Sequence, residues 1–154
     1  MHLYLYDLDG KEINQITKGN YDIKDVLGID EKTQTIYYTS SEVSPTEQHT
    51  YSIKLDGSNK KRLTTISGFN TSEFSNNYQY FINTHSDANT PHYITLHDAK
   101  GKELRVLEEN KALKEKLTSL NLSKKEFFSF KTSEGVELNG WMIKPANFDA
   151  TKKY

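Results

Sequence analysis

Hydrophobic and polar residues alternate within short segments along the first two thirds of the chain. In the segment 51–55, Tyr51, Ile53 and Leu55 project to one side of an extended backbone, and the polar residues between them project to the other. A period of two residues is typical of a half-buried β-strand. Asp56-Gly57 follows as a turn and residues 60–64 supply a second short strand, so the pattern predicts a β-hairpin.

The same hairpin pattern occurs three times. Its copies span residues 3–17, 51–64 and 93–108, and each copy turns at a glycine. The turn glycines, separated by 47 and then 44 residues, are Gly10, Gly57 and Gly101. A period near 45 residues is that of one four-stranded blade of a β-propeller, so the chain is predicted to contain propeller repeats.

The segments between the hairpins supply two further strands for each blade. Residues 23–29 pair with 35–40, and residues 71–75 pair with 78–83. The turns that join them carry Asp or Asn, which tolerate positive φ and bond their own backbone. We therefore expect a partial, antiparallel β-propeller of about two and a half four-stranded blades over residues 1–108. Its parts are a half blade at 1–18, a blade at 19–65 and a blade at 66–108.

The pattern changes after residue 108. Asn110 is a plausible N-cap, and leucines at 113, 117 and 120 have the spacing of one short amphipathic helix, so residues 109–123 are predicted to be a linker helix. Aromatic-rich segments at 126–131 and 136–143 then form a second kind of hairpin. We expect residues 124–154 to begin another domain. The fold class is therefore mostly β.

Charge and composition exclude several classes of partner. The chain carries 20 Lys and Arg against 21 Asp and Glu, and no long run of like charge. Nucleic-acid and anionic-membrane surfaces need clustered positive charge, so neither partner is expected. Cysteine is absent, which excludes disulfides and thiolate metal ligands. No targeting signal is recognised, and both ends interrupt the strand pattern, so we expect a piece of a longer protein.

No segment has the pattern of a catalytic or phosphate-binding motif. A serine hydrolase of the α/β type needs Gly-x-Ser-x-Gly, whereas Gly57-Ser58 belongs to a hairpin turn. Residues 135–140 have the wrong glycine spacing for a phosphate loop. Glu108-Glu109 directly precedes the predicted helix, where acidic residues complement the helix dipole. This interpretation is favoured over a glycosidase carboxylate pair. We expect no catalytic residue and no cofactor in this chain.

Histidines and aromatic residues are the remaining candidates for a binding site. His92 and His97 are five residues apart and so point to opposite faces of one strand. The other three histidines are His2, His49 and His85. For all five, a position on the surface or at a strand end is favoured over a metal site. Strand spacing likewise favours core packing over ligand stacking for Phe127, Phe128, Phe130 and Trp141.

Four segments carry a resemblance to a known family. They are residues 15–19, 93–97, 104–113 and 148–154, and they occur in family order along almost the whole chain. In these segments the chain resembles the dipeptidyl peptidase IV branch of the prolyl oligopeptidase family of serine peptidases. The resemblance implies an eight-bladed propeller above an α/β-hydrolase domain, and removal of N-terminal dipeptides with Pro or Ala second.

The resemblance also implies which parts the chain lacks. Residues 1–108 would be the last blades and residues 124–154 the first hydrolase strands. The family's substrate-holding glutamates and arginine lie in earlier blades. Its oxyanion tyrosine, nucleophile elbow, aspartate and histidine lie beyond Tyr154, so no functional residue of the family maps onto this sequence. The longer protein is expected in the periplasm or cell envelope of a bacterium.

Two hypotheses for function stand. In the first, the chain is a non-catalytic fragment of a serine exopeptidase, and peptide substrate binds only to the longer protein. In the second, it is a stand-alone β-rich interaction module without activity. A reading frame that continues into a Gly-x-Ser-x-Gly elbow would favour the first. In either case we expect self-association through exposed blade and hairpin edges, at residues 1–18 or 124–145.

Overall fold

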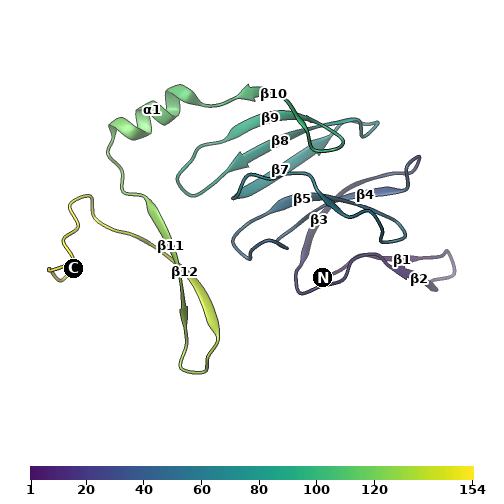
Figure 1. Ribbon diagram of the computed structural model, residues 1–154, viewed down its shortest axis with the longest axis horizontal. Coiled ribbons are helices and arrows are strands. Elements are labelled where there is room, and N and C mark those ends of the chain that lie inside the picture. The colour runs from purple at the N-terminus through teal and green to yellow at the C-terminus, as the bar shows by residue number, and fades with distance from the viewer. The chain divides into compact units, whose positions relative to one another are not determined.

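The computed structural model describes residues 1–154. It contains twelve strands and one helix (Figure 1). The elements in chain order are β1 (Tyr4–Tyr6), β2 (Glu12–Gln15), β3 (Ile23–Asp30), β4 (Thr35–Ser40), β5 (His49–Lys54), β6 (Lys61–Arg62), β7 (Phe69–Phe74), β8 (Tyr80–Ser86), β9 (Tyr93–Asp98), β10 (Glu103–Glu108), α1 (Lys111–Ser119), β11 (Lys125–Lys131) and β12 (Glu137–Ile143). The fold is mostly β, as the alternating pattern predicts.

Every strand pairs antiparallel with a neighbour in sequence. The sheets are β1-β2, β3-β4-β5-β6, β7-β8-β9-β10 and β11-β12. Two four-stranded sheets and one two-stranded sheet therefore reproduce the half blade and two blades of a partial propeller. The chain divides into two compact units, one of residues 1–87 with 92–109 and the other of residues 88–91 with 110–154.

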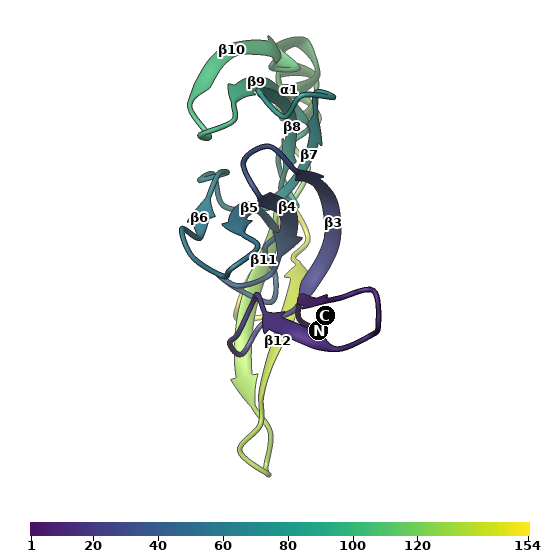
Figure 2. The ribbon, with the colours of Figure 1, turned by 90° about the vertical axis from the view of Figure 1, so that its right-hand side faces the viewer.

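The three sheets of the first unit succeed one another along it, from β1-β2 through β3–β6 to β7–β10 (Figures 1 and 2). Two apolar clusters lie between them. The first joins buried Ile16, Tyr38 and Tyr51 with Leu3 and Leu5 of the half blade. The second includes Tyr37, Leu63 and Phe81, with Phe74 and Tyr78 packed against it. Each neighbouring pair of sheets thus shares a hydrophobic layer, which is how propeller blades bury their faces.

The turn glycines of the three hairpins share one conformation. Gly10, Gly57 and Gly101 have φ values of 81°, 82° and 84°, in the left-handed region that glycine adopts without a steric penalty. In the turns between the other strands, Asp30 and Asn77 accept backbone hydrogen bonds as expected. The positive φ there falls instead on Gln34 and Tyr78, one or more residues later than the Asp and Asn positions.

Helix α1 of the second unit forms where the leucine spacing predicts it. Asn110 occupies the predicted N-cap position, with a left-handed backbone and no capping hydrogen bond from its side chain. Glu108 ends β10 and Glu109 lies directly before the N-cap residue, so the expected dipole role of Glu108-Glu109 stays a prediction. No helix of the chain is long and apolar enough to cross a membrane.

Candidate functional site

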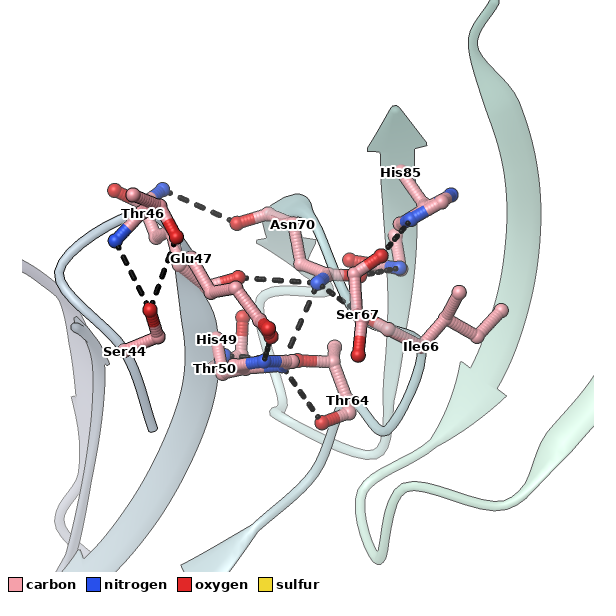
Figure 3. A network of polar contacts seen from close by, with 12 residues as sticks. Ser44, Thr46, Glu47, His49, Thr50, Thr64, Ile66, Ser67, Asn70 and His85 are labelled. Carbon is pink, nitrogen blue, oxygen red and sulfur yellow. Dashed lines mark hydrogen bonds and ion pairs between the residues drawn. The ribbon is translucent and has the colours of Figure 1, made fainter. Parts of the chain in front are cut away.

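A group of interacting polar side chains lies between the two four-stranded sheets of the first unit (Figure 3). The sheets meet at a short parallel bridge between Gln48 and Phe69. The backbone nitrogen of Gln48 donates to the Gly68 carbonyl over 3.0 Å, and the backbone nitrogen of Asn70 donates to the Gln48 carbonyl over 3.0 Å. We call the buried side chains around this bridge the polar seam: Gln48, His49, Thr50, Thr64, Asn70, Ser72 and Asn83.

Asn70 is the centre of the polar seam and is fully buried. Its Nδ2 donates to the carbonyl oxygens of Gln48 and Ile66, both over 3.0 Å. Its Oδ1 accepts a hydrogen bond of 3.1 Å from Nδ2 of Asn83. Both amide hydrogens and the amide oxygen therefore have partners, which offsets the cost of removing this group from water.

A chain of side-chain hydrogen bonds continues from Asn83 back to the first sheet. Ser72 Oγ donates to Asn83 Oδ1 over 3.2 Å. The Thr50 hydroxyl lies 2.8 Å from Ser72 Oγ. Because Ser72 has one hydroxyl hydrogen and gives it to Asn83, Thr50 is the donor in this last pair. The donors therefore run in one direction, from Thr50 through Ser72 and Asn83 to Asn70.

His49 lies at the edge of the polar seam and links it to Glu47. Its Nε2 lies 2.8 Å from Glu47 Oε2, and its Nδ1 lies 3.1 Å from the Thr64 carbonyl oxygen and 3.3 Å from Thr64 Oγ1. A carboxylate only accepts hydrogen bonds, so the ring donates from Nε2 to Glu47 and is held between Glu47 and Thr64. The ring is almost completely buried, whereas the Glu47 side chain is partly exposed.

Thr64, His49 and Glu47 have the residue types of a nucleophile, a base and an orienting carboxylate. The Thr64 hydroxyl, however, is buried and accepts the backbone N–H of Thr50 over 3.0 Å. A hydroxyl that already accepts this bond and lies beneath the sheet surface is closed to a substrate carbonyl. The polar seam therefore joins two sheets, and its chemistry is hydrogen bonding between blades.

Three histidines lie at or next to strand ends but are not on the surface, and His2 and His92 lie outside the strands. His49, His85 and His97 are buried, because each lies on the face of its sheet that a neighbouring element covers. His97 stacks on Phe81 with ring centroids 4.8 Å apart, and its Nε2 lies 2.8 Å from Thr95 Oγ1. His92 is exposed. No three His, Cys, Asp or Glu side chains come together as a group that could hold a metal ion.

The aromatic residues of the second unit are exposed, which contradicts the expectation of core packing. Phe127 is 58 % exposed and Trp141 is 59 % exposed, on the face of the hairpin that they share. A two-stranded hairpin has no second layer to cover either of its faces. Trp141 instead lies under the ammonium group of Lys125, which is 4.5 Å from the ring centroid. Phe128 lies over Gly140 on the opposite face, where a Cβ would meet its ring.

Two tyrosines of the first apolar cluster have perturbed acidity. Tyr38 is fully buried, its hydroxyl has no hydrogen-bond partner, and burial raises its pKa far above the usual value. Burial, together with the negative charge of Glu42, raises the pKa of Tyr51 to about 12. The two rings stack with centroids 5.5 Å apart. These side chains act as apolar groups at neutral pH, which suits packing between blades.

Repeated four-stranded antiparallel sheets, stacked face to face with buried layers between them, define the chain as part of a β-propeller. Residues 1–92 match the family described as "Dipeptidyl peptidase IV (DPP IV) N-terminal region", and the chain belongs to this family.

Individual relatives match nearly the whole chain. Dipeptidyl peptidase 4 of Arthroderma otae and that of Trichophyton rubrum are each 34 % identical over 160 residues, covering 99 % of this chain and 20 % of the relative. The crystal structure of Porphyromonas gingivalis dipeptidyl peptidase 4 is 42 % identical with a TM-score of 0.91, over 99 % of this chain and 22 % of that one. The chain thus spans about a fifth of the length of these relatives.

Proposed function

We propose that this chain is a structural, non-catalytic segment of a dipeptidyl peptidase IV-like serine exopeptidase. In this proposal the blades of the first unit are propeller scaffold, and the second unit connects the propeller to the first strands of a hydrolase domain. The observation that carries the proposal is the match to the P. gingivalis enzyme, which extends over 99 % of this chain at 42 % identity but over 22 % of the enzyme.

The polar seam supports a scaffold role. Its side chains are buried, and they form hydrogen bonds with one another or with the backbone. These bonds hold the sheets together. A substrate-binding site needs polar groups that are left open toward a ligand. The longer protein would remove N-terminal Xaa-Pro or Xaa-Ala dipeptides, with the nucleophile, base and oxyanion donors supplied by residues beyond Tyr154.

The first test compares the chain with the longer reading frame. Incubation of each with a Gly-Pro or Ala-Pro chromogenic amide should give turnover for the longer protein and none above buffer for residues 1–154. Inhibitor-sensitive turnover that co-purifies with residues 1–154 would contradict the non-catalytic role.

A second test asks whether the segment is scaffold. The matching fifth of the P. gingivalis enzyme is replaced by this chain. A folded chimaera should keep the dipeptidyl peptidase activity of its host, since the reacting groups come from the host. A chimaera that folds, as judged by circular dichroism and a cooperative thermal transition, but lacks activity would show that the segment supplies more than scaffold.

The location of the longer protein belongs to the same proposal. We propose the periplasm or cell envelope of a bacterium, as the resemblance to the dipeptidyl peptidase IV branch implies. Cell fractionation with an antibody against residues 1–154 tests this. Recovery of the protein with a cytoplasmic marker would contradict it.

A further inference from the structure

The second and third hairpins of the repeat each touch the preceding hairpin at one recurring place. A Cβ built on the turn residue Gly57 would lie 3.1 Å from the carbonyl oxygen of Ile16, and one built on Gly101 would lie 2.6 Å from that of Leu63. Ile16 and Leu63 occupy the same repeat position, six residues after their own turn glycines. The positive φ favours glycine at both turns, and the neighbouring backbone leaves little space for a side chain at Gly57 and none at Gly101.

A second contact recurs beside the first. Asn14, four residues after Gly10, donates from Nδ2 to the Leu55 carbonyl over 3.1 Å. Lys61, four residues after Gly57, donates from Nζ to the Lys100 carbonyl over 2.6 Å. In both cases a side chain of one hairpin reaches a carbonyl just before the turn glycine of the next hairpin. The repeat therefore carries one stacking contact in two parts.

The first hairpin has one half of this contact and no partner for it. Gly10 has the same φ as the other two turn glycines, but nothing lies within 4 Å of where its Cβ would be. Tyr4 and Tyr6 are exposed, whereas the residues at the same repeat positions are buried in the second copy, as Tyr51 and Ile53, and in the third copy.

The last hairpin has the other half. Leu107 stands six residues after Gly101, at the position of Ile16 and Leu63, and is 38 % exposed where they are 5 % and 2 % exposed. Arg105 stands at the position of Asn14 and Lys61. It is paired across the sheet with Leu96, which in turn is opposite exposed Ile82.

We propose that the chain associates head to tail with a second copy of itself, by repeating its own blade-stacking contact. The sheet β7–β10 of one copy packs on the half blade of the next, so that Leu107 lies over Gly10 and Arg105 reaches the carbonyl groups before it. The turn 7–10 carries Asp7 and Asp9, so a cation there is also complementary in charge. This contact joins two different surfaces and is therefore heterologous.

The association goes beyond the proposed function, since it concerns this chain by itself and no peptidase step. The chain's average mass is measured by sedimentation equilibrium across a concentration series. It should rise with concentration for the unaltered chain. Gly10→Asn should keep the chain monomeric, because Asn tolerates the left-handed turn but fills the space that Leu107 must enter.

A matched control is available in the second unit. Gly135 also has a φ of 81° and nothing within 4 Å of its Cβ position. Gly135→Asn should therefore change the turn chemistry equally and leave the mass unchanged. Leu107→Lys, on the other contacting surface, should also give a monomer. Circular dichroism should show that all three variants are folded.

Mixing the two monomeric variants gives the decisive result. Gly10→Asn retains its Leu107 surface, and Leu107→Lys retains its Gly10 surface, so the mixture should form a one-to-one dimer that grows no further. A chain that stays monomeric at every concentration would overturn the proposal. So would association that survives both variants but is lost in Phe127→Lys, because that result would place the contact on the second unit.

Discussion

At the scale of single residues, the polar seam depends on the chemical difference between an amide and an acid. Asn83 donates to Asn70 and accepts from Ser72, so it uses both ends of its amide group. Asn70 cannot reverse its role, because it gives both amide hydrogens to carbonyl oxygens. The seam therefore requires a donor at the Nδ2 position of Asn83.

Asn83→Asp should destabilise the fold by about 1–3 kcal/mol, since two oxygens would then face each other in a buried site. Asn77→Asp is the matched control. Asn77 is exposed and its Oδ1 accepts hydrogen bonds from Ser75 and Gln79, which a carboxylate accepts equally well. Chemical denaturation measures both variants, and equal midpoints would contradict the directional order of the seam.

The tyrosines of the first apolar cluster give a prediction for alkaline pH. The folded-state pKa of Tyr51 is raised to about 12, above an unfolded value near 10. A group whose folded pKa is raised contributes stability that is complete below the unfolded pKa and is lost as the pH rises through the folded one. The free energy of unfolding should therefore fall between about pH 10 and pH 12.

Tyr51→Phe removes this titrating hydroxyl but keeps the ring that stacks on Tyr38. The variant should lose stability more slowly than the unaltered chain across that pH range. Exposed Tyr6→Phe serves as the control and should follow the unaltered chain. Denaturation at a series of alkaline pH values measures the difference, and parallel curves for Tyr51→Phe and the unaltered chain would contradict it.

At the scale of secondary-structure elements, the hairpins could be predicted from sequence and the polar seam could not. Alternation and the turn glycines place β5, β9 and β10 within two residues of their observed bounds. Asn70, Ser72, Asn83 and His85 also alternate with other residues along β7 and β8, but polar residues at alternate positions predict a face in water. The facing sheet, remote in sequence, buries them instead, so local patterning carries no signal of it.

The turn glycines allow the energetic cost of a close contact between hairpins to be separated from the cost of backbone strain in the turn. Gly10 and Gly101 have nearly the same φ, so Gly→Ala costs the same backbone strain at both. Only at Gly101 would the added Cβ also meet a backbone, 2.6 Å from the Leu63 carbonyl oxygen. Gly101→Ala should therefore cost about 1–3 kcal/mol more than Gly10→Ala. Thermal melts at a protein concentration where the chain is monomeric measure this, and equal losses would contradict the close approach.

At the scale of the whole molecule, stability is concentrated in the first unit. All nine buried hydrophobic side chains lie between Ile16 and Phe81, whereas α1 has no buried residue and the β11-β12 hairpin exposes apolar groups on both faces. The second unit therefore has no core of its own. Its assignment to a hydrolase domain rests on resemblance and stays a prediction.

A chain truncated after Glu109 should keep the three stacked sheets, because it retains both apolar clusters and the polar seam. Its thermal midpoint should lie close to that of residues 1–154, measured by circular dichroism at a strand-sensitive wavelength. A truncated chain that fails to fold would show that residues 110–154 contribute to the stability of the sheets.

The pairing of each strand with its sequence neighbour also sets an order of events during folding. Hairpins such as β8-β9 close loops of a few residues, whereas the bonds of the polar seam join residues such as Gln48 and Asn70, 22 positions apart. Short loops cost less entropy to close, so each sheet should form as its strands leave the ribosome and dock on its predecessor afterwards. Pulse-labelled hydrogen exchange would then show protection of β9 amides before the amide of Asn70, and the reverse order would refute this sequence of steps.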